Sequence, residues 1–427
     1  MQKVLIISYF SPPCRLVGAE RTEYWAKNLY KYGYYPIILT RQWNPNQIEL
    51  TNKINNNYNE HLIYDHYEVY KVPYKRSLRD ILSNYKSLIL FQKALTFLES
   101  ILSNFFISAL PFSNFQKKAE VILNKNQEIN HVINSVAPFS ALSISFHLKK
   151  KFSKINFIAD YRDEWTTRTT NTPNSFLENI LFHLDSKSEK KWTSNIDFFI
   201  TVSETWKKSI SDLINKNGFV IKNGHNFKDL KISKTIKNGN KLRIIYPGTL
   251  FSYQRIEIFI SAVKKVHDKN SNVIQVDFYG VEVNKKELRR LKQLTKGYED
   301  VFIIHNKLNK VELAKELQIS DIGLITDYEN LKGCLPVKIF DYYYFGLTIL
   351  LCPSDFDEME EFIKKTNTGF SVNSEKECYY KLMKLVKQKQ QNKLAVLNQN
   401  KELLTHYSRE HQTYLLSELL NKHKVDS

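Results

Sequence analysis

Short apolar runs alternate with longer amphipathic stretches along most of the chain. In the first half the runs lie at 4–7, 36–39, 132–133, 157–159 and 198–202. In the second half they lie at 242–246, 273–279, 301–304, 322–325 and 349–351. Strands of a parallel sheet are buried on both faces, so they appear as continuous apolar runs separated by helices. The pattern predicts the α/β class with two parallel-sheet domains.

The boundary between these domains is predicted from a change in composition. Residues 221–241, IKNGHNFKDLKISKTIKNGNK, are polar, rich in Lys and Asn, and include Gly224 and Gly239. Such a stretch is typical of a linker, and 427 residues exceed what one hydrophobic core usually organises. The predicted division is a first domain at 1–228, a linker at 229–240, a second domain at 241–400 and a closing helical segment at 401–427.

One predicted helix carries an apolar stripe with a spacing of three and four residues. Its members are Ile81, Tyr85, Leu88, Phe91, Leu95, Leu98, Leu102 and Phe105. A helix that faces the core is the favoured interpretation, and a helix that lies on a membrane is the alternative. Phe97, Phe106 and Ile107 widen the apolar surface and keep the alternative open.

Net charge and cysteine content indicate the kind of partner and argue against some kinds of site. The net charge of +18, from 62 basic and 44 acidic residues, favours an anionic partner, unless it reflects a general drift toward Lys. Cys14, Cys334, Cys352 and Cys378 lie far apart, which argues against a zinc site or a disulfide framework and favours a reducing compartment. No metal and no cofactor are expected. No signal peptide or membrane-spanning segment is predicted either, because the apolar runs are too short.

Two candidate sites follow strands of the first domain. Gly18 opens the predicted helix AERTEYWAKNLYKYG, so it either lets a ligand approach the helix N-terminus or forms a plain turn. Arg162 and Asp163 come directly after the strand at 157–159, in IADYRDEWTT. At the carboxyl edge of a sheet this pair is either a sugar-facing site or a structural salt bridge.

The second domain carries a glycine and an arginine directly after its first strand. Gly248 and Thr249 begin the segment that leads to Arg255, in YPGTLFSYQRIE. Ligands of open α/β folds bind at this edge, and a guanidinium group suits a diphosphate. The alternative is a surface Arg255 that pairs with Glu257.

The stretch GCLPVKIFDYYYFG offers a second anion-binding feature. Gly333 frees the backbone, and Pro336 is predicted as the first residue of a helix, so the amides of Cys334 and Leu335 can point at an anion. Lys338 adds positive charge to the first turn, and Asp341 could accept hydrogen bonds from ribose hydroxyls. The alternative is a surface ion pair between Lys338 and Asp341.

Four motifs taken together resemble one enzyme family over nearly the whole chain. They are VLIISYFSPP, PFSALSISFHLKKK before DYRDEW, GTLFSYQR, and GCLPVKIFDYYYFG. In this order they resemble the GT-B glycosyltransferases of family four, and in particular a bacterial subgroup. The resemblance implies two Rossmann-like domains facing across a cleft, with the sugar nucleotide mainly on the second and the acceptor mainly on the first. It also implies that the final helix, within 402–420, packs back on the first domain.

The resemblance assigns roles to the candidate residues. It places Arg255 and Lys338 on the donor diphosphate, Asp341 on the ribose, and Gly18 under the phosphates or the transferred sugar. The loop HNKLNK, with Lys307 and Leu308, would contact the base through backbone groups.

Two positions depart from the family pattern. Asp341 stands for the second of two glutamates that many members carry eight positions apart, but the first position is Gly333, and Glu329 is out of register. Arg162-Asp163 stands where many members have His-Asp. Both departures concern the residues that would contact the sugar.

The sequence thus predicts a metal-independent glycosyltransferase that moves a sugar, with retention, from a nucleoside diphosphate sugar to a lipid-linked glycan in surface polysaccharide synthesis. Arg255, Lys338, Arg162 and Asp163 are its predicted catalytic residues. A non-hydrolysing sugar-nucleotide epimerase on the same fold is one alternative, and a basic nucleic-acid-binding protein is another. The latter is disfavoured, because no basic face interleaved with aromatic residues is found.

A peripheral position on the anionic cytoplasmic leaflet is the last expectation. The segment 74–118 is the predicted contact surface, because basic residues flank its apolar stripe. They are Lys75, Arg76, Arg79, Lys86, Lys93, Lys117 and Lys118.

Overall fold

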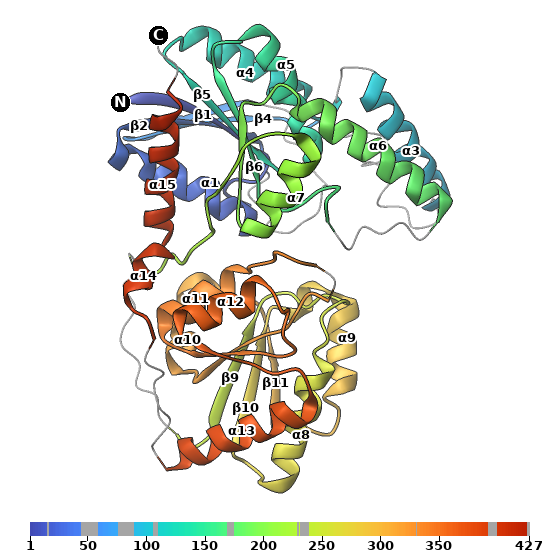
Figure 1. Cartoon of the computed structure of the whole chain (residues 1–427), viewed down its shortest axis with the longest axis vertical. Helices are drawn as coiled ribbons and strands as arrows, with labels where there is room; N and C mark the ends of the chain where they lie inside the picture. Colours follow the sequence, from blue (N-terminus) through green and yellow to red (C-terminus); the bar gives the residue numbers. More distant parts are fainter. Residues whose placement is uncertain are drawn as a thin grey trace. The chain divides into compact units, whose positions relative to one another are not determined.

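The computed structural model describes residues 1–14, 17–43, 59–75, 89–105, 110–168, 175–228, 230, 239–329, 331–391 and 399–424. The chain divides into two compact units (Figure 1). Unit 1 comprises Met1–Lys222 and Gln412–Ser427, and unit 2 comprises Asn223–His411. Each unit is built around a sheet of its own, so the predicted α/β class with two Rossmann-like domains is confirmed.

The sheet of unit 1 has the order β3-β4-β2-β1-β5-β6-β7-β8, and only the β3–β4 pair is antiparallel. Its strands are β1 (Gln2–Ser8), β2 (Tyr34–Arg41), β3 (Glu60–Ile63), β4 (Glu68–Val72), β5 (His131–Val136), β6 (Asn156–Tyr161), β7 (Phe198–Thr201) and β8 (Gly218–Val220). Alternate residues of the central strands enter two separate cores, one on each face of the sheet. The sheet is therefore covered on both sides, as its continuous apolar strands require.

Helices supply the other half of each core in unit 1. The described helices are α1 (Val17–Asn28), α3 (Ile89–Phe105), α4 (Ser113–Lys125), α5 (Leu142–Lys151), α6 (Phe176–Thr193), α7 (Glu204–Ile214) and α15 (Arg409–Lys422). Helix α15, red in Figure 1, lies beside α1. Its Leu416 and Leu420 are fully buried in the core that α1 shares, and Tyr34 donates a hydrogen bond to Asn421 over 2.8 Å.

Unit 2 has a fully parallel sheet with the order β11-β10-β9-β12-β13-β14. Its strands are β9 (Leu242–Pro247), β10 (Ile274–Tyr279), β11 (Phe302–His305), β12 (Ile322–Ile325), β13 (Thr348–Leu351) and β14 (Gly369–Ser371). Its described helices are α8 (Glu257–Lys269), α9 (Lys285–Leu294), α10 (Lys310–Ile319), α11 (Val337–Phe345), α12 (Glu358–Thr366), α13 (Glu375–Gln390) and α14 (Glu402–His406). Helices α8, α9 and α13 cover one face, and α10, α11 and α12 cover the other.

The observed domain boundaries differ from the predicted ones at both places where the chain passes from one unit to the other. Unit 1 ends at Lys222 rather than at residue 228, because the next residues bind to the closing segment of unit 2. The His225 amide donates to the Tyr407 carbonyl, the Arg409 amide donates to the His225 carbonyl, and Phe227 is buried in a core of unit 2. The closing segment is also divided, since residues up to His411 belong to unit 2. Of the predicted linker, residues 229 and 231–238 lie outside the described residues.

Helix α3 does not bury the apolar stripe that was expected to face the core. Among its described side chains, the exposed ones are Phe91, Ala94, Leu98 and Leu102, which share one face at helical spacing. Leu95, Phe97 and Ile101 are only half-buried. The prediction of a core-facing stripe is therefore wrong for the described residues. Ile81, Tyr85, Leu88, Phe106 and Ile107, and the Phe105 side chain, lie outside what the structure describes.

None of the described helices is long and apolar enough to cross a membrane.

Candidate functional site

The carboxyl ends of β9 and β10 meet closely because each strand is followed by a glycine. Gly248 has φ +111° and Gly280 has φ +83°, a region that other residues rarely adopt. The Gly248 amide donates to the Tyr279 carbonyl over 2.7 Å. A Cβ atom on Gly280 would lie 3.6 Å from Gly248 Cα and 3.7 Å from Lys307 Cβ. These two strand ends and the loop after β11 therefore form one continuous surface.

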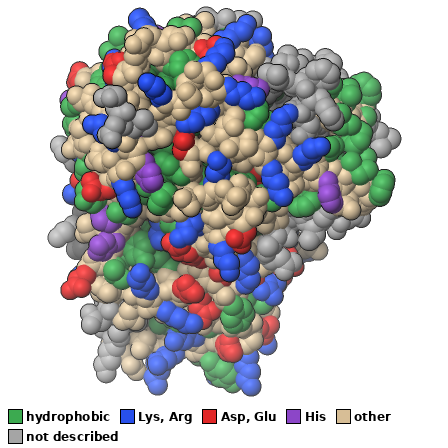
Figure 2. Space-filling view, turned by 45° about the horizontal axis from the view of Figure 1, so that its top comes forward, with side chains coloured by type: hydrophobic (Ala, Val, Ile, Leu, Met, Phe, Trp, Pro, Cys, Tyr) green, Lys and Arg blue, Asp and Glu red, His purple; other side chains and the backbone are tan. Residues whose placement is uncertain are grey.

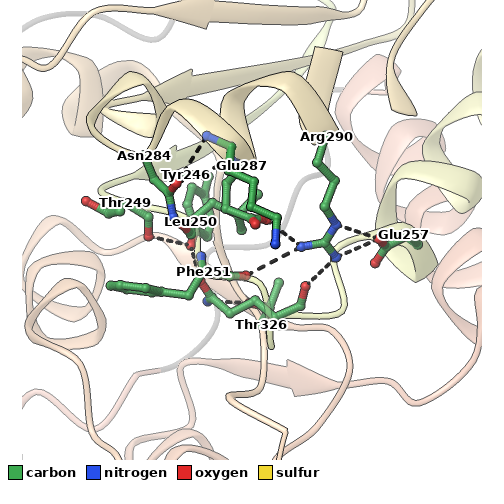
Figure 3. A network of polar contacts seen from close by, with 11 residues as sticks. Tyr246, Thr249, Leu250, Phe251, Glu257, Asn284, Glu287, Arg290 and Thr326 are labelled. Carbon is green, nitrogen blue, oxygen red and sulfur yellow. Dashed lines mark hydrogen bonds and ion pairs between the residues drawn. The ribbon is translucent and has the colours of Figure 1, made fainter. Parts of the chain in front are cut away.

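A buried glutamine fixes the loop that follows Gly248, and Figure 3 shows three of its partners, Tyr246, Phe251 and Thr326, around this loop. Gln254 is 1% exposed, and its Oε1 accepts hydrogen bonds from the Tyr246 hydroxyl at 3.2 Å and the Phe251 amide at 3.0 Å. Its Nε2 donates to Thr326 Oγ1 over 2.7 Å. The loop after β9 is thus attached to the loop after β12.

Arg290 holds the same loop from α9. Its guanidinium donates to the carboxylates of Glu257 and Glu287 and, over 2.8 Å, to the Gln254 carbonyl. Figure 3 shows this arginine between Glu257 and the loop. Because Arg290 occupies Glu257, the alternative pairing of Arg255 with Glu257 is wrong.

Arg255 instead pairs with an aspartate that sequence reasoning missed. Its Nε and Nη2 both donate to Asp327 Oδ2, the former over 3.2 Å. The Asp327 side chain is 2% exposed, and burial raises its pKa above the usual range, whereas the Arg255 side chain is 52% exposed. The hydrogen bond to Asp327 raises the pKa of Arg255. Asp327 therefore fixes the guanidinium by one edge and leaves about half of the Arg255 side chain open to solvent.

Lys338 approaches the same surface from the first turn of α11. Its Nζ lies 3.7 Å from the centre of the Tyr246 ring and 3.6 Å from where a Cβ of Gly248 would be. Burial lowers the pKa of Lys338 to about 7, and attraction to Cys334 and Asp341 offsets this only in part. Lys338 makes no hydrogen bond or ion pair with any described residue, so the alternative of an ion pair with Asp341 is wrong. Lys338 is half-buried, so its charged amine loses part of its hydration without gaining an anionic partner, and an anionic ligand would offset that cost.

The segment before α11 has the glycine turn that was predicted, but the helix begins one residue later than expected. Gly333 has φ +72°, and its amide donates to Asp357, while Lys332 donates to the Asp355 carbonyl over 2.7 Å. Pro336 is the N-cap and α11 begins at Val337, so Pro336 is not the first helical residue as predicted. Its extended backbone, with ψ 148°, excludes it from the helix. Cys334 and Leu335 are therefore held in a loop anchored to the residues before α12.

The loop at 305–310, expected to contact a base through backbone groups, has some of these groups already occupied. The Lys307 amide donates to Glu282 over 2.7 Å, and the Asn309 amide donates to Glu312 over 2.9 Å. Leu308 packs against a core of unit 2. The Lys307 amide is therefore not available to a ligand in this state of the loop, and the carbonyl groups are the remaining candidates.

In unit 1 the structure brings Gly18 and Arg162 together. Arg162 Nη1 donates to the Gly18 carbonyl, and the guanidinium lies 5.4 Å from the centre of the Phe10 ring. Burial lowers the pKa of Arg162. Asp163 is exposed and forms no ion pair with Arg162 in the described part of unit 1, so the structural salt bridge is not formed. Arg162 instead connects the end of β6 to the start of α1.

This contact explains why position 18 is a glycine. A Cβ there would lie 2.1 Å from Arg162 Nη1. We expect Gly18→Ala to displace the guanidinium and to lower the free energy of unfolding by about 1–2 kcal/mol. In an Arg162→Ala background the same change is expected to stabilise, by up to ~1 kcal/mol, because alanine favours the helix over glycine. Urea denaturation of the two single variants and the double variant measures this, and additive effects would contradict it.

A second buried group in unit 1 was also missed. Arg21 Nε donates to Asp160 over 3.1 Å, its Nη1 donates to the Ile221 carbonyl over 2.9 Å, and Ser135 donates to Asp160 over 3.0 Å. Arg21 and Asp160 are 139 positions apart in the chain, and no local motif signals the pair. The network ties α1 and β6 to the end of unit 1.

Comparison with known proteins gives a family match for most of unit 2. Residues 227–403, within unit 2, match the family model "Glycosyl transferases group 1". A search of curated proteins by sequence gives no match.

Solved structures match over the whole chain. Sucrose-phosphate synthase from Thermosynechococcus elongatus has a TM-score of 0.70 and 12% identity, with 99% of each chain covered. A glycosyltransferase from Rickettsia africae has a TM-score of 0.58 and 15% identity, with 98% of each chain covered. WaaG, a glycosyltransferase involved in lipopolysaccharide biosynthesis, has a TM-score of 0.62 and 10% identity, with 97% of this chain and 99% of WaaG covered. Residues 227–403 thus match a group 1 glycosyl transferase domain, and the whole chain has the two-domain GT-B fold of these structures.

Proposed function

We propose that the donor is a nucleoside diphosphate sugar whose diphosphate binds at the carboxyl edge of the unit 2 sheet. The observation that carries this proposal is Lys338, a half-buried amine beside Gly248 that contacts the Tyr246 ring but makes no hydrogen bond or ion pair with the described residues. The N-terminus of α11 adds the positive end of a helix dipole at the same place. A diphosphate would supply the negative charge that both features favour.

The same groups would stabilise the leaving diphosphate during transfer. Negative charge grows on the diphosphate as the bond to the sugar breaks, so preorganised cations lower the barrier. Lys338 is one such cation. Arg255 is the other, because Asp327 binds its Nε and Nη2 and leaves Nη1 for a phosphate oxygen. This chemistry needs no metal ion.

The acceptor proposed is a hydroxyl of a lipid-linked glycan, held by unit 1, and the transfer proceeds with retention of anomeric configuration in surface polysaccharide synthesis. The resemblance to family four supports retention. The involvement of WaaG in lipopolysaccharide biosynthesis supports the class of acceptor. A structure of HepE from Anabaena in complex with UDP-glucose, with a TM-score of 0.61 and 9% identity, supports the class of donor. Gly18, Arg162 and Asp163 are the proposed contacts of unit 1 with the sugars.

A panel of nucleoside diphosphates and their sugars tests the donor proposal by thermal shift. A ligand at 100 times its Kd should stabilise the protein by about 2.7 kcal/mol, which raises Tm by a few degrees. Incubation of the preferred sugar nucleotide without acceptor should leave the sugar unchanged, whereas an epimerised sugar would support an epimerase. No shift with any member of the panel would contradict the proposal.

Arg255→Ala is expected to lower kcat by roughly 100-fold while leaving the fold intact, because it removes one cation from the leaving diphosphate. The measurement is turnover of the donor identified by the panel. Arg289→Ala is the matched control, since Arg289 is exposed on α9 and makes no ion pair among the described residues. Equal turnover of the two variants would exclude Arg255 from the site.

A further inference from the structure

Helix α3 of unit 1 presents an apolar face to solvent. Phe91, Leu98 and Leu102 are 55%, 50% and 42% exposed, and Ala94 lies on the same face. The described side chains of α3 that are exposed are therefore apolar. A helix on the surface of a globular protein normally points its polar face outward, so an apolar face that meets solvent is unusual.

Helix α6 packs beside α3 and extends the apolar surface (Figure 1). At its first turn Phe176 is 82% exposed, the highest value among the large apolar side chains that the structure describes, and Leu177 is 42% exposed. We call the exposed side chains Phe91, Leu98, Leu102, Phe176 and Leu177 the α3–α6 patch. Figure 2 shows hydrophobic side chains gathered at the right-hand edge of the molecule, with Lys, Arg and His beside them.

Basic residues continue the exposed stripe of α6. His183, Lys187 and Lys190 follow Phe176 at intervals of seven, four and three positions, so all four share one side of the helix, and all are exposed. The sequence from 74 to 118, which contains α3, holds seven basic residues and two acidic ones. The stripe thus has an apolar end and a basic end. In an anionic bilayer the acyl chains would take the apolar end and the phosphate headgroups would take the basic end.

We propose that the α3–α6 patch is a membrane-docking surface that inserts Phe91, Leu98 and Phe176 among the acyl chains of an anionic bilayer. Lys187 and Lys190 contact lipid phosphates at the same time. A second copy of the chain suits this surface less well, because a two-fold contact would place the same basic stripe against itself. Lys118 lies 4.5 Å from the centre of the Tyr70 ring and is not part of the proposed docking surface.

Sedimentation of the purified full chain with lipid vesicles tests the proposal without any measurement of activity. Vesicles of phosphatidylcholine alone are compared with vesicles of equal parts phosphatidylcholine and phosphatidylglycerol. We expect the wild type to sediment with the anionic vesicles and much less with the neutral ones. Phe91→Ser/Leu98→Ser/Phe176→Ser and Lys187→Glu/Lys190→Glu should each bind the anionic vesicles at least ~10-fold more weakly.

Phe356→Ser is the matched control, since Phe356 is 70% exposed and lies in unit 2. This variant should bind as the wild type does, and all variants should keep a single thermal transition at the wild-type Tm or within a few degrees of it. Unchanged sedimentation of the triple apolar variant would overturn the proposal. A wild-type dimer in solution that the triple variant converts to monomer, without vesicle binding, would overturn it in favour of self-association. Because the donor plays no part in this assay, its result is separate from the test of the proposed function.

Discussion

Lys338→Met is expected to abolish the thermal shift by nucleoside diphosphates and to lower turnover by about 1000-fold. Methionine keeps the length of the side chain but removes the cation beside Gly248. It also removes an amine whose burial is unfavourable, so the free enzyme should be as stable as the wild type or more stable. Loss of function together with unchanged or increased Tm would distinguish a ligand-binding lysine from a structural one.

The pH dependence of donor binding gives a second measure of Lys338. Its pKa is lowered to about 7, and a bound diphosphate favours the charged form. Above this pH the amine must take up a proton when the donor binds, so affinity should fall up to tenfold per unit of pH. Below it the amine is already charged, and affinity should level off. Calorimetric titration between pH 6 and pH 9 measures this slope for the wild type.

Lys376→Met is the matched control, since Lys376 is exposed on α13 of the same unit. This variant should keep the donor affinity and the pH slope of the wild type. If Lys338→Met itself binds donor normally, the diphosphate does not lie beside Gly248, and the proposed function loses the observation that carries it.

The central strands could be predicted from the sequence because burial on both faces leaves a strong local signal. All ten predicted apolar runs coincide with β1, β2, β5, β6, β7, β9, β10, β11, β12 and β13 to within one residue at either end or lie inside them. The strands that were missed are β3, β4, β8 and β14, which lie at or next to the sheet edges. An edge strand is half-exposed, so residues such as Glu60 and Lys71 replace the apolar run.

The sequence indicated which strand ends carry the site but not which side chains pair there. Arg255 follows β9 as expected, yet its partner Asp327 is 72 positions away and its expected partner Glu257 binds Arg290. Arg162 likewise bonds to the Gly18 carbonyl, 144 positions away, rather than to its neighbour Asp163. Asp327 could have been suspected, because it comes two residues after the strand at 322–325 at the same carboxyl edge. Pairing between residues so far apart in the chain depends on the packing of the whole unit. No local pattern in the sequence indicates which residues will pair.

The exposed face of α3 shows a different limit. A stripe at helical spacing shows that one face of a helix is apolar, and it does not show what that face contacts. Phe91, Leu98 and Leu102 would give the same pattern in a core, at a membrane or at a subunit interface. The structure excludes the core for the described residues, since those side chains meet solvent.

Unit 1 is expected to lose about 3 kcal/mol of stability in acid because of one buried histidine. His131, the first residue of β5, is fully buried, and burial lowers its pKa to about 4, with His423 and Lys424 acting in the same direction. In the unfolded chain a histidine has a pKa of about 6.5. The unfolded state therefore binds the proton first as pH falls. The stabilisation is complete above pH 6.5, is about 2.5 kcal/mol smaller at pH 4.5, and is fully lost below pH 4.

Tryptophan fluorescence can follow this transition in unit 1 alone. All five tryptophans, Trp25, Trp43, Trp165, Trp192 and Trp206, lie in that unit. Urea denaturation at pH 7.5 and pH 4.5 should show the loss in the wild type, and His131→Gln should lose about 2.5 kcal/mol less between the two pH values, because glutamine does not titrate. His183→Gln, which replaces an exposed histidine of α6, should lose as much as the wild type. If His131→Gln and the wild type lose the same amount, the acid sensitivity of unit 1 comes from its carboxylates and not from the histidine beneath α15.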